Sequence, residues 1–257
     1  DAATPAFAGI YWGDSQRLLR AAYQIRRTSG VYSLWCSHYS CGPDGFVLHF
    51  FSHLMEGKPF AIVENDGHTA AAGVKTRVEA FLHCVRRDLA AAGAAGLPQP
   101  LPSFGTDSVW LSEIRARGTK VLVPRMGHAA QAVAACLRGA GVDAECLPVA
   151  DRAALELGRR RTSGKECIPA IVTLGSLLKR LDELRAGDQR VAIFMPSARG
   201  PCRFGVYNIL DRLVLERLGW AGRAEVWSPE SRNYFHGVPP GLAARAYAGM
   251  RAMDLLE

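Results

Sequence analysis

Apolar runs alternate with helical patterns along most of this chain. Runs with the length and composition of buried strands lie at 31–35, 59–64, 120–124, 143–147, 190–195 and 225–227. Apolar residues at helical spacing predict helices over 46–55, 129–138, 171–184 and 207–218, and a long helix that passes through Glu79 and Leu89. Strands that alternate with helices indicate an α/β fold with mostly parallel sheets flanked by helices.

The segment 90–102 is rich in Ala, Gly and Pro, which is typical of a linker. We therefore expect two Rossmann- or flavodoxin-like units, residues 1–105 and residues 106–257, divided near 94–118. Each unit is expected to hold its own mostly parallel sheet with flanking helices. Sheets of this kind bind ligands at the carboxyl ends of their strands.

Composition narrows the class of protein. No apolar run approaches the ~20 residues of a membrane-spanning helix. The chain starts without Met or a signal-peptide pattern and ends inside a helical pattern, so we expect a piece of a longer polypeptide. Seven cysteines, an odd number, do not suit a secreted disulfide framework, and we expect a reducing, cytoplasmic compartment without membrane association.

The net charge of +7 suits a nucleic acid or an acidic small molecule. However, the basic residues are scattered, and the densest run, Arg159-Arg160-Arg161, is short. Zinc-finger spacing, RNA-binding aromatic signatures and basic heptads are all missing from the sequence. We interpret the charge as an ordinary solvated surface and expect no nucleic-acid partner.

The segment from Gly158 to Lys165 resembles a phosphate-binding loop, but five residues separate Gly158 from Gly164 where that motif has four. Glu166 also stands where Ser or Thr should follow the lysine. A dinucleotide-binding Gly-x-Gly-x-x-Gly pattern is missing too, so nucleotide binding is not predicted.

Three short motifs carry a cysteine among Gly and Pro, each between an expected strand and an expected helix. They are Cys41-Gly42-Pro43-Asp44, Gly164-Lys165-Glu166-Cys167-Ile168-Pro169 and Gly200-Pro201-Cys202-Arg203-Phe204-Gly205. Helix N-termini offer free N–H groups and a positive dipole end, which favour thiolates and anionic cofactors. Glycines such as Gly42 let the backbone approach a ligand closely. We expect the three cysteines to converge on one site.

The remaining cysteines have simpler interpretations. Cys84 and Cys136 lie within helical patterns and Cys146 in a strand, so we expect them to be small buried side chains. Cys36 ends a strand just before Cys41 and is ambiguous. Three thiolates with one open position suit a catalytic zinc ion as well as a 4Fe–4S cluster, and the spacing leaves both open.

Several segments together resemble one family. They are the three cysteine motifs, Gly57-Lys58-Pro59, the run from His68 through Gly73 and Thr76 to Phe81, and the extended forms Thr162–Pro169 and Met195–Asn208. The chain resembles the acyl-CoA dehydratase activase-related family, which is akin to the cluster-binding subunits of 2-hydroxyacyl-CoA dehydratases. The resemblance extends from Tyr11 to Leu256.

The resemblance implies a low-potential, oxygen-sensitive 4Fe–4S cluster held by Cys41, Cys167 and Cys202. It implies an ATPase activase domain or protein as the electron donor, and anaerobic chemistry. In the dehydratase relatives the cluster passes one electron to an acyl-CoA thioester, and a ketyl radical then expels the hydroxyl group. The resemblance also places His68 as a catalytic candidate, with helix capping as its alternative role. Lys165 and Arg203 adjoin the expected ligands, where they tune the cluster or meet coenzyme A phosphates, or serve structural roles.

The chain departs from the family at Asp66-Gly67-His68-Thr69-Ala70-Ala71, where two acidic residues of the family pattern are missing. Three functions therefore stay open. The first is a cluster module for electron transfer to, or radical dehydration of, an acyl-CoA, which is hydro-lyase chemistry. The second is a non-catalytic iron–sulfur scaffold or electron relay in a larger activase-related protein, as part of a longer chain or a hetero-oligomer. The third is a zinc or thiol-redox protein.

Overall fold

The structure is a computed structural model that describes residues 7, 9–65, 71–91, 109–220, 222–229 and 237–256. The chain forms two compact units, Asp1–Gly105 (unit 1) and Thr106–Glu257 (unit 2). Each unit contains a parallel sheet with helices packed against it, which confirms the expected α/β class.

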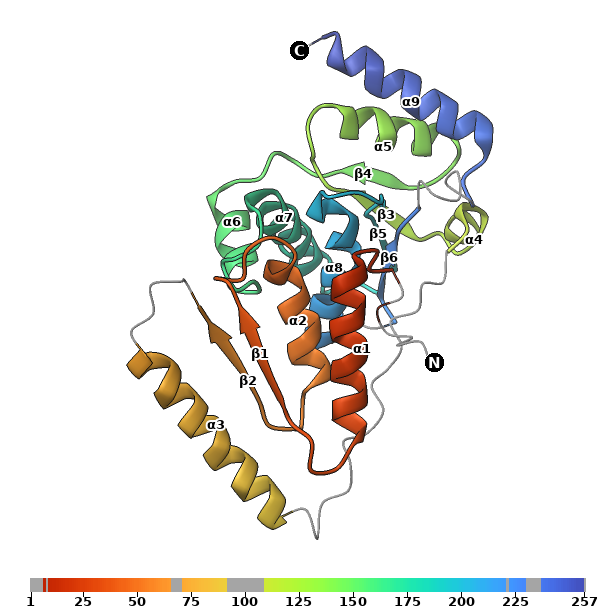
Figure 1. Ribbon diagram of the computed structural model, residues 1–257. Coiled ribbons are helices and arrows are strands. Elements are labelled where there is room, and N and C mark those ends of the chain that lie inside the picture. The colour runs from red at the N-terminus through yellow and green to blue at the C-terminus, as the bar shows by residue number, and fades with distance from the viewer. Residues whose placement is uncertain are drawn as a thin grey trace. The chain divides into compact units, whose positions relative to one another are not determined.

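Unit 1 has a two-stranded parallel sheet, β1–β2, and three helices in its described part (Figure 1). The elements are α1 (Gly13–Arg27), β1 (Ser33–Ser37), α2 (Asp44–Leu54), β2 (Phe60–Glu64) and α3 (Ala71–Ala91). In Figure 1, α1 and α2 lie on one side of the sheet and α3 lies on the other. The two strands pair from Ser33 with Phe60 to Ser37 with Glu64, so their carboxyl ends lie at the same edge.

The core of unit 1 is built by α2. Phe46, Phe50 and Phe51 are fully buried, and the Phe51 ring packs on Trp35 of β1 at 4.8 Å between ring centroids. Burial of a large aromatic side chain contributes about 2 kcal/mol or more to stability. The apolar residues that predicted this helix therefore pack against β1 and α1.

Helix α3 packs on β2 with partly buried side chains, and Asp88 accepts a hydrogen bond of 2.6 Å from the Tyr32 hydroxyl. Cys84 is exposed on this helix. The expectation that Cys84 is a buried core residue is therefore wrong. The predicted helix does form, but within unit 1 only a narrow strip of its surface contacts the sheet, and Cys84 lies outside that strip.

Two buried basic side chains cap the C-terminal ends of α1 and α2 reciprocally. Arg26 of α1 donates to the carbonyls of Leu54 and Glu56, at 2.6 Å each, at the end of α2. Lys58, which follows α2, donates to the carbonyls of Ile25 and Thr28 at the end of α1. Helix C-termini carry unsatisfied carbonyls and a negative dipole end, so cations are favourable there.

Unit 2 contains a four-stranded parallel sheet in the order β4-β3-β5-β6. Its strands are β3 (Lys120–Val123), β4 (Ala144–Cys146), β5 (Val191–Phe194) and β6 (Ala224–Trp227). Its helices are α4 (Leu111–Ala116), α5 (Ala129–Gly139), α6 (Arg152–Arg159), α7 (Ile168–Leu184), the 3-10 helix η2 (Arg203–Val206), α8 (Tyr207–Arg217) and α9 (Pro240–Asp254). The chain runs from β3 to β4 and then returns to β5 on the other side of β3. The sheet therefore has a topological switch point between β3 and β5.

Both faces of the unit 2 sheet are covered (Figure 1). On one face Val121, Val123 and Ala192 join a buried cluster with residues of α4, α5 and α9. The neighbouring positions Leu122 and Ile193 are equally buried and point to the opposite face, because side chains alternate along a strand. Burial on both faces explains why these strands are continuous apolar runs.

The expected strands all form, with ends that differ by one or two residues. Three described α-helices were not predicted, namely α1, α4 and α6, and of α9 only the C-terminal end was predicted as a helical pattern. The most consequential is α6, because it places the segment before Cys167 between two helices. The expectation that all three cysteine motifs follow a strand is therefore wrong for Cys167. The linker proposed at 90–102 lies almost entirely outside the described residues.

Helices α6 and α7 approach each other so closely that their contact requires glycine. A Cβ atom on Gly158 would lie 2.0 Å from the Ile171 carbonyl oxygen, and one on Gly175 would lie 1.7 Å from the Ala154 carbonyl oxygen. Both distances are far inside van der Waals contact, and each neighbouring atom belongs to the backbone. Gly158 is therefore a helix-packing residue, in agreement with the rejection of a phosphate loop here.

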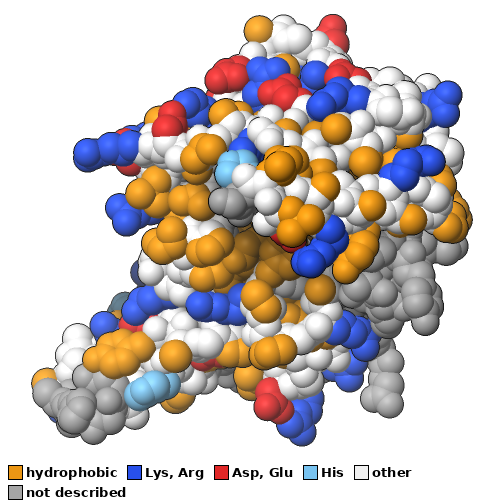
Figure 2. Space-filling view, turned by 90° about the horizontal axis from the view of Figure 1, so that it is seen from above, with side chains coloured by type: hydrophobic (Ala, Val, Ile, Leu, Met, Phe, Trp, Pro, Cys, Tyr) orange, Lys and Arg blue, Asp and Glu red, His pale blue; other side chains and the backbone are white. Residues whose placement is uncertain are grey.

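The surface seen in Figure 2 shows Lys and Arg side chains spread among acidic and apolar ones, without one continuous basic area on that face. In the part of the chain that the structure describes, there is no helix with the length and apolar character needed to cross a membrane.

We predict that Gly175→Ala lowers the free energy of unfolding by about 3 kcal/mol or more, because α6 and α7 must separate to admit the methyl group. Gly139→Ala is the matched control, since a Cβ atom there meets nothing within 4 Å. Alanine at this helical position should be neutral or stabilise by up to about 1 kcal/mol. Urea denaturation of both variants measures the difference, and equal stabilities would contradict the close packing.

We predict that Lys58→Met destabilises unit 1 by about 2 kcal/mol, because buried carbonyls at the end of α1 lose a charged donor. Burial lowers the pKa of the Lys58 ammonium, but the carbonyls and the face of the Tyr32 ring at 5.2 Å hold the cation in place. Lys75→Met, at a side chain that is 75% exposed, is the control and should change stability by less than about 0.5 kcal/mol. A Lys58→Met protein as stable as this control in urea would argue against the capping role.

Candidate cysteine site

Cys41 lies in the loop that connects the carboxyl end of β1 to α2. Tyr39 and Ser40, just before it, both have positive φ values of 54° and 53°, and Gly42 follows with a φ of 60°. A left-handed conformation costs a residue other than glycine roughly 1–2 kcal/mol, so this loop is strained beside the cysteine. Strained backbone of this kind is concentrated at functional sites.

Hydrogen bonds hold the strained loop in its conformation. The Ser37 hydroxyl donates to Asp44 at 2.7 Å and accepts from the Ser40 amide at 3.0 Å. The Ser40 hydroxyl in turn donates to Glu64 of β2 at 2.7 Å. The side chains of Cys41 and of Cys36 are exposed, and neither is in a disulfide. The loop therefore presents the Cys41 thiol to solvent at the carboxyl edge of the unit 1 sheet.

Cys167 is the residue that immediately precedes the first turn of α7, and its backbone carbonyl accepts from the amide of Ala170. The preceding loop is folded around the buried carboxylate of Glu166. One Glu166 oxygen accepts from the Ser163 amide and hydroxyl, and the other accepts from the Gly164 amide, each at 3.0 Å. Glu166 thus fixes the backbone that delivers Cys167 to the helix N-terminus.

Cys202 occupies the same position before the 3-10 helix η2, in the loop that follows β5. Ser197 anchors this loop: its amide donates to the Pro229 carbonyl at 3.0 Å, and its hydroxyl donates to the Gly205 carbonyl at 2.9 Å. The Cys202 side chain is exposed. Because β5 borders the switch point of the sheet, this loop lies where doubly wound folds commonly bind ligands.

Tyr207, at the start of α8, brings the two unit 2 cysteines into one electrostatic environment. Its hydroxyl lies 2.6 Å from the Cys167 sulfur, within hydrogen-bond distance. Burial, the hydrogen bond to Cys167 and the charges of Cys167 and Cys202 raise the pKa of the Tyr207 hydroxyl, and the nearby Arg203 opposes the shift. Sequence reasoning assigned Tyr207 no role, since its partner lies 40 positions earlier in the chain.

Lys165 and Arg203 also belong to this neighbourhood. The Arg203 guanidinium donates to the Lys165 carbonyl at 3.5 Å, which links the Cys167 loop to the Cys202 loop. The Lys165 side chain is exposed, and the backbone turn beside it uses Gly164 with a φ of 83°. Roles of these two cations toward a cofactor or coenzyme A stay predictions, as does the role of Gly42.

His68 lies outside the described residues. Cys41 belongs to unit 1 and the other two expected ligands belong to unit 2, so convergence of the three thiols also stays a prediction. Within the described part of the chain, no group of three or more His, Cys, Asp and Glu side chains is arranged to hold a metal ion. Cys136 and Cys146 pack against the buried cluster of unit 2, although both are partly rather than fully buried.

A second feature of α8 was not anticipated. Asp211 is buried within the unit, and its Oδ2 atom makes no hydrogen bond. Burial raises the pKa of its carboxyl to about 8, although the charge of Arg212 opposes the shift. Asn208, also buried, donates to the Ser228 hydroxyl at 2.9 Å. The helix that begins at Tyr207 therefore carries two buried polar side chains, Asn208 and Asp211.

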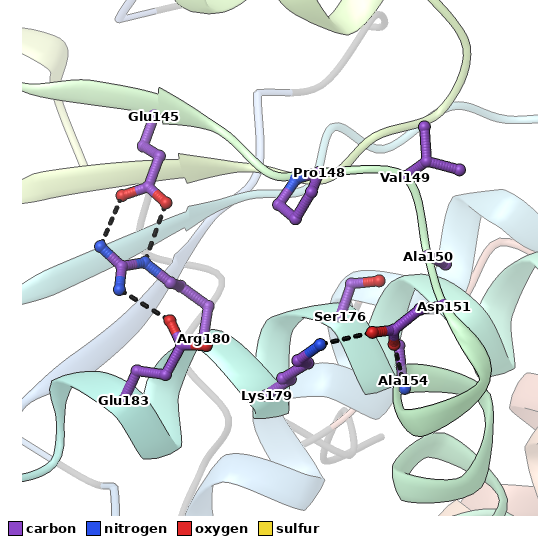
Figure 3. Close-up of a pocket in the computed structure, with 10 residues that line it drawn as sticks. All are labelled: Glu145, Pro148, Val149, Ala150, Asp151, Ala154, Ser176, Lys179, Arg180 and Glu183. Carbon is purple, nitrogen blue, oxygen red and sulfur yellow. Dashed lines mark hydrogen bonds and ion pairs between the residues drawn. The ribbon is translucent and has the colours of Figure 1, made fainter.

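A cavity of about 380 Å³ opens elsewhere in unit 2, between the loop after β4 and the side of α7 (Figure 3). Its charged side chains pair with one another. Arg180 contacts Glu145 and Glu183, with a shortest distance of 2.8 Å, and Lys179 contacts Asp151 at 2.5 Å. The hydrogen bond from Lys179 lowers the pKa of the Asp151 carboxyl. No cysteine lines this cavity, and each of its charged side chains already has an oppositely charged partner.

Comparisons with family models, with curated proteins and with solved structures found no match to this chain. The likeness to the activase-related family therefore depends on the cysteine motifs and the segments around them.

We predict that the Asp211 carboxyl makes the folded protein less stable as the pH rises. Its folded pKa of about 8 exceeds the ordinary value of 3.8, so the folded state keeps a proton that the unfolded state has lost between these values. Stability should fall through this range by at most about 1.4 kcal/mol per pH unit. Asp211→Asn, which is neutral throughout, should remove this part of the decline.

Urea unfolding at about pH 5 and about pH 8 measures the effect for each protein. Asp188→Asn serves as a control, because Asp188 is exposed in a loop. If the Asp211→Asn protein lost as much stability over this range as the parent protein, the buried carboxyl would not be responsible for the decline.

Proposed function

We propose that this chain is a 4Fe–4S cluster-binding module in which Cys41, Cys167 and Cys202 are the thiolate ligands. The observation that carries the proposal is the arrangement around Tyr207. One buried hydroxyl lies against the Cys167 sulfur and within the electrostatic influence of Cys202. These thiols come from loops that precede two different helices, and neither forms a disulfide.

The donor chemistry of these positions fits an anionic metal cluster. Each unit 2 cysteine immediately precedes the first turn of a helix, where backbone N–H groups lack intrahelical partners. Thiolates are the usual ligands of iron–sulfur clusters, and positive charge such as that of Arg203 stabilises a net negative group. A 4Fe–4S cluster, when bound, supplies low-potential one-electron transfer, and three thiolates leave one iron open to exchange.

Cys41 is the proposed third ligand, from unit 1. It lies at the carboxyl edge of its own sheet, as Cys202 does in unit 2, and its thiol is exposed on a loop held by Ser37, Ser40 and Asp44. Its rigid, strained surroundings are compatible with a ligand that must be fixed before the metal arrives. Cys36 is also exposed, but it lies within β1 rather than at a helix N-terminus.

The physiological partners follow from the family resemblance. We propose an ATP-driven activase as the electron donor and an acyl-CoA as the electron acceptor, with radical dehydration as the reaction. An electron relay in a larger iron–sulfur protein would use the same three ligands. A zinc site built from the same thiols is the competing chemistry, and metal analysis separates it from the cluster.

We predict that protein purified anaerobically and reconstituted with iron and sulfide binds one oxygen-sensitive cluster. Replacement of Cys41, Cys167 or Cys202 by Ser, one at a time, should lower the bound iron by at least about half, because each thiolate holds the cluster directly. Iron and sulfide assays together with the EPR spectrum of the reduced protein provide the measurement.

Cys84→Ser and Cys136→Ser are the controls, since one thiol is exposed on α3 and the other packs against the core. Both variants should bind as much iron as the parent protein. Stoichiometric zinc without iron or sulfide in the anaerobic protein would overturn the cluster proposal. Iron binding that survives all three single replacements would overturn the ligand assignment.

A further inference from the structure

The Tyr207 side chain is 5% exposed, so its hydroxyl needs a hydrogen-bond partner within the protein. The Cys167 sulfur provides one at 2.6 Å. Burial and packing on neighbouring side chains restrain the Tyr207 ring, so this contact with the sulfur is a fixed feature of the site. The Phe204 ring packs edge-on against the Tyr207 ring, with centroids 5.3 Å apart and an angle of 71° between the planes.

The backbone on both sides of the contact is also fixed. Tyr207 is the first residue of α8, and the next residue, Asn208, is tied to Ser228. On the other side, Cys167 is held between the Glu166-bound loop and the first turn of α7. The hydroxyl and the sulfur are therefore presented to each other by two elements that are each anchored independently.

The direction of the hydrogen bond depends on which atom carries a proton. A metal-bound cysteine is a thiolate and can only accept, whereas a phenol ordinarily keeps its proton up to about pH 10. With a metal on the sulfur, the tyrosine hydroxyl is the donor.

We infer that Tyr207 is a positioning residue of the metal site, which holds the Cys167 sulfur in place and donates a hydrogen bond to it; the inference rests on the proposed function for its metal-bound form. Hydrogen bonds to cluster sulfurs withdraw electron density from the iron and raise the reduction potential. The phenol would thus lower the electron density at the iron that Cys167 binds. The Cys167 thiolate would accept this hydrogen bond, whereas the Cys202 thiolate is exposed to solvent.

The hydrogen bond itself is tested in metal-free protein. The infrared difference between the parent protein and Tyr207→Phe isolates the C–O stretching band of Tyr207. In a Cys167→Ala background this band should shift, because the Tyr207 hydroxyl has lost the sulfur to which it is hydrogen-bonded. The Cys136→Ala replacement should leave the band in place. A band that is the same with and without Cys167 would overturn the inference, whether or not a cluster binds.

The effect on the metal is tested in reconstituted protein. Tyr207→Phe keeps the ring and its packing but removes the hydroxyl, so the midpoint potential of the cluster should shift to a more negative value while the iron content is retained. Tyr247→Phe, at an exposed residue of α9, should leave the potential unchanged.

The two proposals fail in distinguishable ways. A parent protein that binds no cluster would overturn the proposed function, and the infrared experiment would still decide the contact between Tyr207 and Cys167. A cluster that forms normally, with the same potential in Tyr207→Phe as in the parent protein, would overturn the positioning role and leave the proposed function standing.

Discussion

The close crossing of α6 and α7 is the constraint on which the candidate site of unit 2 depends. Gly158 and Gly175 remove the side chains that would otherwise separate the two backbones. With the helices in contact, the eight residues from Arg160 to Cys167 must turn back on themselves within a short space. The buried Glu166 carboxylate satisfies the amides that this turn exposes, and the turn ends by delivering a thiol to the N-terminus of α7.

From that anchored thiol the remaining parts of the site follow in order. Tyr207 reaches Cys167 from α8, and α8 begins where the loop after β5 ends. That loop carries Cys202 and is fastened to the end of β6 through Ser197 and Pro229. Three features therefore fix the positions of Cys167 and Cys202: the helix crossing, the switch point in the sheet and the buried phenol. They come from elements that lie far apart in the sequence.

The sequence predicted the strands well because those of unit 2 are buried on both faces and appear as continuous apolar runs, for example in β3 and β5. It missed α1, which is largely polar, and α6, whose Gly158 was considered as part of a phosphate loop. The cysteines at helix N-termini were found through the Gly and Pro residues around them. Tyr207 and Asp211 were not, since their importance comes from burial and from partners that only the folded chain brings near.

The reciprocal caps of unit 1 have a consequence for how that unit can be divided. Arg26 of α1 binds carbonyls at the end of α2, and Lys58, which follows α2, binds carbonyls at the end of α1. The C-terminal end of each helix is therefore capped by a cation from the other helix or from the segment after it. A fragment that starts after Thr28 would retain the ammonium of Lys58 but lose the carbonyls that accept its hydrogen bonds, and it would leave the Leu54 carbonyl without the Arg26 donor. The first helix is thus one half of an electrostatic pair, and a piece of unit 1 in which both caps are complete must include residues 25–58.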